Sequence, residues 1–236
     1  MDEVNRQAAA PALPRTVLAF DCSGASCSAA VLSEGDILAH RFAAMARGQA
    51  EALVPMIGEV MAQAGLSFVS LDAIVTTVGP GSFTGIRLGL AAAQGLALAS
   101  SRPILAVSAF EAHLAGLGAG PPAHPVLVAI DSRRGPVFAQ VFGTNRAALT
   151  EPMQLEPAEV ERHLPAGPVV AIGDGAVLLK GYVDPARIGP AGASPHIDAA
   201  ALARLVGGAL AWRPRVLAPV PLYLRPPDVT TPKPRP

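Results

Sequence analysis

The chain has few charged and few aromatic residues: 15% of its 236 residues are charged and 4% are aromatic. A core built with so few rings must be aliphatic and rich in alanine, with close approaches between backbones. The chain also lacks a surplus of one charge, since Lys plus Arg and Asp plus Glu both number 18. Phosphate contacts supply much of the affinity of nucleic-acid-binding proteins, so this balance argues against RNA binding by the chain alone.

Cysteine and long hydrophobic runs are scarce as well. Cys22 and Cys27 are the only cysteines, and without a third cysteine or nearby histidines they do not form a zinc site. We expect both to be reduced thiols in a cytoplasmic protein. The most apolar run, 88–99, contains Gln94 and is too short to span a membrane. The N-terminal stretch starts with acidic residues and lacks the hydrophobic core of a signal peptide.

The first half of the chain alternates strand and helix patterns. Three short apolar runs separated by tight turns predict an antiparallel meander, and an apolar stripe then predicts an amphipathic helix. Pro55 lies inside that helix and should kink it or strain its first turn. The strands are predicted at 16–20, 27–32, 37–42, 72–79 and 102–108, and the helices at 48–65, 84–100 and 109–117.

The second half repeats part of this order after a glycine- and proline-rich linker. VLVAIDSRRGPVFAQVF (126–142) echoes VLAFDCSGASCSAAVL (17–32), and PVVAIGDGAVLLKG (168–181) echoes the strand, glycine loop and helix of 74–89. A last helix is predicted at 198–212. Two copies of one unit predict an α/β fold of two ribonuclease-H-like lobes, each a mixed sheet with flanking helices, as in actin, the Hsp70 ATPase domain and sugar kinases. We expect a flexible N-terminal tail (1–14), an N-terminal lobe (15–115), a linker (116–125), a C-terminal lobe (126–225) whose last helix could pack back on the N-terminal lobe, and a proline-rich tail (226–236).

The glycine loop GPGSFTGIR (79–87) is not a Walker loop, because it has no lysine to reach a terminal phosphate. Its glycines permit positive φ or close backbone approach, and Ser82 or Thr84 could cap the helix that follows. The backbone N–H groups at this helix start could hold an anion, although a plain strand-to-helix turn explains the glycines equally. Asp21 and Asp131 each end a strand before a turn that contains serine, where related kinases hold metal or nucleotide and where an Asx turn would look the same. The candidate nucleotide or anion cleft comprises Asp21, Ser23, Gly79, Gly81, Ser82, Thr84 and Asp131.

Small residues line one face of the helix predicted at 84–100. Gly85, Gly89, Ala92, Leu96 and Ala99 share this face at 100° per residue. Each glycine inside a helix costs about 1 kcal/mol relative to alanine, so two on one stripe need a compensating close contact. That contact is either a partner or the core of the chain's own lobe.

No catalytic constellation has a strong signature in this sequence. The five histidines form no H-x-x-x-H or H-E-x-x-H pair, and G-x-S-x-G is absent. We therefore predict no catalytic residue and no metal ligand. A peptidase is a third candidate function, and the absence of both a metal motif and a catalytic triad from the sequence argues against it.

The motifs quoted above resemble the TsaB family. GPGSFTGIRLGLAAAQGLALA, LAFDCSGASCSAAVL, AIDSRRGPVFAQVF and PLYLR carry the likeness, which runs from about Thr16 to Arg225. The resemblance implies a non-catalytic scaffold for threonylcarbamoylation of the adenosine beside the tRNA anticodon. It implies binding to the catalytic paralogue TsaD, work with the ATPase TsaE, a functional link to TsaC, and a homodimer in isolation. tRNA would be reached through the complex, and ATP or ADP with magnesium would bind in the complex, with no intrinsic cofactor.

The same resemblance places the partner interface on the two helices of the N-terminal lobe. The interface residues it implies are Leu53, Ile57, Val60, Met61, Gly85, Gly89, Ala92 and Leu96. Gln49 stands where many relatives have histidine, which is a departure from the family pattern. The alternative is a nucleotide-binding phosphotransferase or ATPase of the actin-like fold with activity of its own, and this would depend on Asp21.

Overall fold

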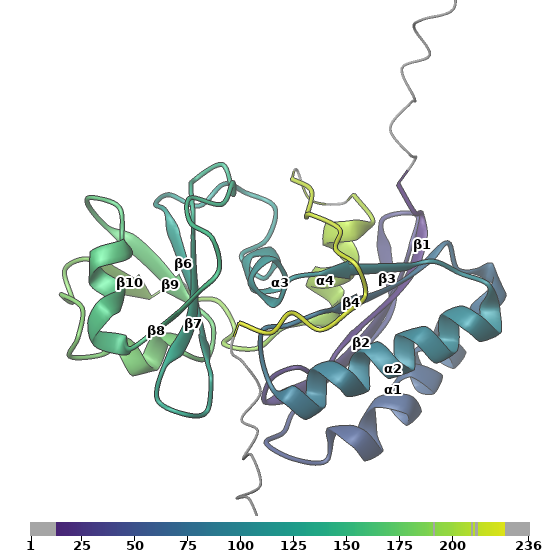
Figure 1. The fold of residues 1–236 in the computed structure, drawn as a ribbon. Helices are drawn as coiled ribbons and strands as arrows, with labels where there is room; N and C mark the ends of the chain where they lie inside the picture. The colour runs from purple at the N-terminus through teal and green to yellow at the C-terminus, as the bar shows by residue number, and fades with distance from the viewer. Residues whose placement is uncertain (1–12, 191, 209, 211, 225–236) are drawn as a thin grey trace, which may run out of the picture.

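The computed structural model describes residues 13–190, 192–208, 210 and 212–224. These residues form two five-stranded mixed sheets with helices between and around them (Figure 1). The predicted tails fall almost entirely on 1–12 and 225–236, which lie outside the described residues. Among the described residues, no helix is long and apolar enough to cross a membrane.

The first sheet has the strand order β3-β2-β1-β4-β5. Antiparallel pairing of β1 with β2 and of β2 with β3 confirms the predicted meander, while β4 and β5 join in parallel. The helices α1 and α2 lie side by side on one face of this sheet (Figure 1). The elements are β1 (Thr16–Asp21), β2 (Ser26–Ser33), β3 (Asp36–Ala44), α1 (Gln49–Ala64), β4 (Ala73–Thr77), α2 (Phe83–Ser100), β5 (Ile104–Val107) and α3 (Ala109–Ala115), with a 3₁₀ turn at Phe68–Ser70 between α1 and β4.

The second sheet repeats this topology in the order β8-β7-β6-β9-β10, with β6 in the place of β1. Its central strand pairs antiparallel with β7 and parallel with β9, as β1 does with β2 and β4. This symmetry confirms the predicted α/β class with two ribonuclease-H-like lobes. The elements are β6 (Val126–Asp131), β7 (Val137–Phe142), β8 (Met153–Leu155), β9 (Val169–Ile172), β10 (Ile188–Pro190) and α4 (Ala199–Val206), with 3₁₀ turns at Pro157–His163 and Ala176–Leu179.

The two lobes share one hydrophobic core. Buried residues of β1 and β2, of α3 and α4, and of β6 and β7 form one contiguous cluster, so α3 and α4 lie between the sheets. A second cluster joins the other face of the first sheet to α1 and α2. The helix α4 is anchored on the first lobe, where Ser28 Oγ accepts a hydrogen bond from the amide of Ala199 at 2.8 Å.

Two local predictions were wrong. The helix expected after the second glycine loop is only the 3₁₀ turn Ala176–Leu179, which ends before Gly181 at φ 87°. The last helix stops at Val206 because Gly207 and Gly208 follow, the latter at φ 78°. The helix α1 continues through Pro55, which lies on its exposed side, and the expected kink or strained first turn stays a prediction.

Candidate functional site: an interlobe cleft and an outer helical face

The first candidate acid, Asp21, is the last residue of β1 and lies in the interior of the lobe. Its carboxylate accepts hydrogen bonds from the hydroxyl and amide of Ser23, at 2.8 and 3.1 Å, and from the hydroxyl of Thr77. Burial raises the pKa of Asp21, and the three hydrogen bonds oppose that rise. With 1% exposure and its oxygens occupied by the chain itself, Asp21 does not face the cleft.

The glycine loop packs directly against the turn that follows β1. A Cβ on Gly81 would lie 2.5 Å from the carbonyl oxygen of Ser23, and one on Gly85 would lie 2.1 Å from that of Cys22. The amide of Ser82 donates to the same Ser23 carbonyl at 2.7 Å, and the Ser82 hydroxyl caps α2 by accepting from the Gly85 amide. These glycines therefore let the start of α2 approach the backbone of the β1–β2 turn.

The corresponding glycines of the second lobe act in the same way. Cβ atoms on Gly173 and Gly175 would lie 2.2 Å from the Ala129 carbonyl oxygen and 2.8 Å from the Ile130 carbonyl carbon. Gly79 and Gly173 have φ values of 98° and 90°. Both glycine loops thus pack on backbone of their own lobe, the first on the turn that follows β1 and the second on the end of β6.

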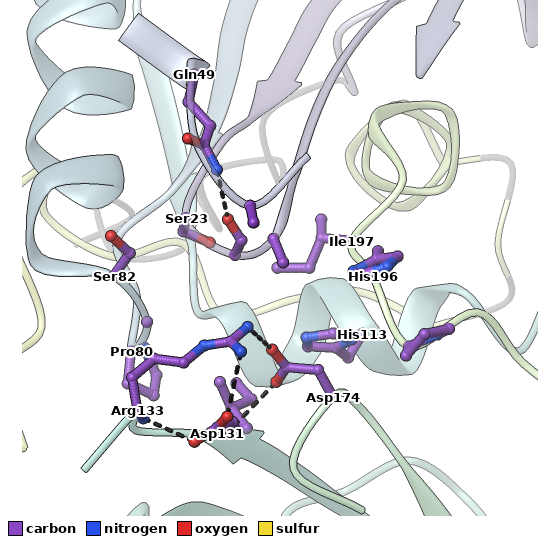
Figure 2. A pocket seen from close by; sticks show the side chains of 16 residues that line it. Ser23, Gln49, Pro80, Ser82, His113, Asp131, Arg133, Asp174, His196 and Ile197 are labelled. Carbon is purple, nitrogen blue, oxygen red and sulfur yellow. Dashed lines mark hydrogen bonds and ion pairs between the residues drawn. The ribbon is translucent and has the colours of Figure 1, made fainter. Parts of the chain in front are cut away.

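The two acids of the second lobe share one neighbouring arginine. The guanidinium of Arg133 lies 3.2 Å from the carboxylate of Asp131 and 2.7 Å from that of Asp174, as Figure 2 shows. Asp174 also accepts from the amide of Asp131 at 2.9 Å. Burial raises the pKa of Asp174, while the Asp131 amide and Arg133 oppose the rise. The sequence did not reveal this ion pair, because Arg133 and Asp174 lie 41 positions apart.

A cleft of about 250 Å³ separates the lobes at this point (Figure 2). Of the candidate cleft residues, Ser23, Gly81, Ser82 and Asp131 line it, whereas Asp21, Gly79 and Thr84 do not. His113 of α3 also lines it, and burial, with a smaller effect of His196, lowers the pKa of His113 to about 4. The Gln49 side chain closes one side by donating to the carbonyl oxygens of Gly24 and Met45, at 3.2 and 3.0 Å. Within the described residues, no group of three or more His, Cys, Asp or Glu side chains could hold a metal ion.

Most of the interface residues implied by the resemblance face inward. Leu53, Ile57, Val60 and Met61 are at most 3% exposed and pack in the core beneath α1. Gly85 and Gly89 are buried as well, the latter against Thr76 and Cys22. Ala92 and Leu96 are half-buried. Of the two contacts left open for this stripe, Gly85 and Gly89 therefore make the one with the chain's own first lobe.

A different apolar face of the same helices points outward. On α1, Val54 is 62% exposed, and on α2, Leu98 is 86% exposed. Gly58 and Gly95 are exposed helix residues with no atom of the chain within 4 Å of an added Cβ. We call this the outer face of α1 and α2; its exposed small and apolar members are Val54, Gly58, Ala62, Ala91, Gly95 and Leu98.

Fold and cleft together define a two-lobed α/β protein with a duplicated ribonuclease-H-like unit, and comparisons specify which one. The family model described as TsaD, tRNA N6-adenosine threonylcarbamoyltransferase, matches residues 37–180. The chain is 36% identical over 122 residues to the tRNA threonylcarbamoyladenosine biosynthesis protein TsaB of Escherichia coli (strain K12), which covers 52% of each chain. An uncharacterized protein of Mycobacterium tuberculosis is 31% identical over 219 residues, covering 90% of this chain and 93% of that one. The structure of YeaZ from Pseudomonas aeruginosa matches with a TM-score of 0.74 at 29% identity, covering 89% of this chain and 99% of that chain.

The chain belongs to the TsaB (YeaZ) family of tRNA threonylcarbamoyladenosine biosynthesis proteins. Its alignments span about half the length of the first two TsaB relatives, 52% and 53%.

Proposed function

We propose that this protein is a non-catalytic scaffold subunit for threonylcarbamoylation of the adenosine beside the anticodon of tRNAs. It acts by binding the catalytic paralogue TsaD through the outer face of α1 and α2. The match of the TsaD family model to 37–180, which includes both helices, supports a relationship between the two partners.

The outer face of α1 and α2 carries this proposal. Gly58 and Gly95 each cost about 1 kcal/mol relative to alanine in a helix interior. Unlike Gly85, neither has a contact with the chain itself that would explain this cost. Val54 and Leu98 expose large apolar side chains beside them. An exposed apolar surface with small residues at its centre favours close packing against helices of another subunit.

The cleft supports the non-catalytic part of the proposal. Its acids already have partners within the chain: Asp21 is bonded to Ser23 and Thr77, and Asp131 and Asp174 share Arg133. A nucleotide phosphate entering here would meet two carboxylates whose nearby arginine is already paired. This arrangement favours the scaffold over the alternative of an actin-like ATPase or phosphotransferase that depends on Asp21.

The remaining partners follow from the same assignment. The protein would be cytoplasmic, would form a homodimer without TsaD, and would work with TsaE and TsaC. It would meet tRNA through the complex, because its 18 basic and 18 acidic residues give no basic surplus. ATP or ADP with magnesium would be bound in the complex, with no cofactor belonging to this subunit.

The test is the dissociation constant of the complex between this chain and TsaD from the same genome, measured by calorimetry. Leu98→Asp places a charge on the outer face, next to Gly95, and should weaken binding at least a hundredfold. Val177→Asp is the matched control, because Val177 is 72% exposed in the other lobe. Both variants should keep the thermal stability of the wild type, since neither side chain is buried. Equal affinities for the two variants, or no complex with the wild type, would contradict the proposal.

A further inference from the structure

Two motifs that lie far apart in the sequence meet at the start of α2. The guanidinium carbon of Arg87 lies 3.7 Å from the ring centre of Phe83, and both residues belong to GPGSFTGIR. Tyr223 of PLYLR stacks on Phe83 with ring centres 5.7 Å apart. Arg87 Nε donates to the Tyr223 hydroxyl at 2.8 Å. These three side chains form a compact cluster, which we call the Arg87 cluster.

The C-terminal segment 217–224 is fixed in place independently of this cluster. The amides of Leu217 and Leu222 donate to the carbonyl oxygens of Ala106 and Val78, both at 2.8 Å. Their side chains pack on Ile86 and Leu90. Tyr223 is therefore presented to α2 by a backbone that is anchored on the first sheet.

Arg87 is oriented but still has donors to spare. The contacts described above use its Nε and one face of its guanidinium, and its terminal nitrogens have no hydrogen-bond acceptor among the described residues. The rings hold the guanidinium in one orientation, which lowers the conformational entropy that the side chain loses on binding. Phe83 and Tyr223 remain 52% and 44% exposed, so the cluster is accessible.

Arg87 also borders the outer face of α2. It precedes Ala91 by four residues and Leu98 by eleven, so at 100° per residue the three lie within about 40° of one another. An oriented arginine backed by aromatic rings at the edge of an apolar patch is typical of residues that dominate binding energy. Its two terminal nitrogens, which have no acceptor within the described part of the chain, match the geometry of a carboxylate.

We propose that the Arg87 cluster is an anchor point of the partner surface and that Arg87 binds a carboxylate of the partner subunit. This inference rests on the proposed binding of TsaD through the outer face. It assigns a role to Phe83 and Arg87, the residues of GPGSFTGIR that the packing of the glycines does not explain. It also makes Tyr223, from the C-terminal segment, a positioning residue for that contact.

The experiment measures the dissociation constant for TsaD at low and high salt for four proteins. Arg87→Gln should weaken binding at least tenfold and should flatten the salt dependence, because the charge pair is lost. Tyr223→Phe removes only the hydroxyl that orients Arg87 and should weaken binding about threefold. Arg162→Gln, which changes an exposed arginine of the other lobe, is the control and should bind like the wild type. Amide exchange of Leu217 and Leu222 shows whether the C-terminal segment stays in place.

The outcomes separate this inference from the proposed function. If Leu98→Asp abolishes binding and Arg87→Gln leaves both the affinity and its salt dependence unchanged, the scaffold stands and the carboxylate contact is overturned. If Arg87→Gln weakens binding but also exposes the Leu217 and Leu222 amides, Arg87 holds the C-terminal segment and the carboxylate assignment is again overturned. If the wild type binds only a second copy of itself, both proposals fail.

Discussion

The buried arginine between the lobes offers the sharpest test of how the two halves are joined. Arg146, in the loop between β7 and β8, is 6% exposed and reaches across to the end of α3 and the linker. Its terminal nitrogens donate to the carbonyl oxygens of Leu114, Gly118 and Gly120, at 2.9, 2.6 and 2.6 Å. The guanidinium carbon lies 5.4 Å from the ring centre of Trp212. One side chain thus connects the second lobe to three segments.

Replacing Arg146 with alanine should destabilise the whole protein. The Leu114 carbonyl belongs to a buried residue and would lose one of its two partners, keeping only the Leu117 amide at 3.3 Å, which costs about 1 kcal/mol. Gly118 and Gly120 are exposed, so water can replace the arginine there and each lost bond costs about 0.5 kcal/mol. Loss of the contact with Trp212 adds about 0.5 kcal/mol. The free energy of unfolding should therefore fall by about 2 to 3 kcal/mol, equivalent to roughly 4–12 °C in Tm for a chain of this size.

Chemical denaturation followed by circular dichroism measures this change, and the fluorescence of the single tryptophan, Trp212, reports on the contact itself. Arg146 has φ 63°, a left-handed conformation that glycine adopts freely. Arg146→Gly should therefore be less destabilising than Arg146→Ala by about 1 kcal/mol. Arg47→Ala, at an exposed arginine, is the control. A loss below about 0.5 kcal/mol for Arg146→Ala would refute the interpretation of this residue as a clamp.

Two further predictions concern glycine and histidine. Gly85→Ala should unfold more readily than the wild type, because its Cβ would lie 2.1 Å from the Cys22 carbonyl oxygen. The Cβ of Gly95→Ala meets no atom within 4 Å, so this variant should stabilise the isolated chain by about 0.5–1 kcal/mol. Equal effects of the two substitutions in thermal denaturation would show that the two glycines share one environment. Burial lowers the pKa of His113 to about 4 in the folded protein, from 6.5. Because the imidazole of the unfolded chain binds a proton more readily, the free energy of unfolding should fall as the pH drops from 6.5 towards 4. The loss should be about 3 kcal/mol by pH 4, and His113→Gln should lack it; parallel stability curves for the two proteins between pH 7 and pH 4.5 would contradict the assigned cause.

The sequence was sufficient to predict the repeated unit because strands leave a local signal. The apolar runs ending at Asp21 and Asp131 appear in the structure as the central strands β1 and β6. The second copy was harder to predict in detail, since AVLLKG has helical residues but Gly181 ends the turn after four of them. The ends of these helical segments depend on glycines with positive φ, and a φ value cannot be read from the sequence.

The direction of a helix face could not be read from residue sizes. Gly85 and Gly95 look alike in the sequence, yet one lies on the Cys22 carbonyl and the other meets nothing. Both stripes of α2 contain glycine and alanine, and only the position of the first sheet decides which is buried. In the same way, Arg133 and Asp174 are distant in the sequence and meet only because β6 and β9 are neighbours.

The most direct test of the scaffold is threonylcarbamoyladenosine formation on tRNA in a reaction reconstituted from TsaC, TsaD, TsaE and this chain. Leu98→Asp alters the outer face, and Asp131→Asn alters the cleft without touching the helices α1 and α2. The scaffold account predicts that Leu98→Asp abolishes the modification, whereas Asp131→Asn supports it at the wild-type rate. Full activity of Leu98→Asp together with loss of activity in a folded Asp131→Asn protein would contradict it and would place the chemistry in the cleft.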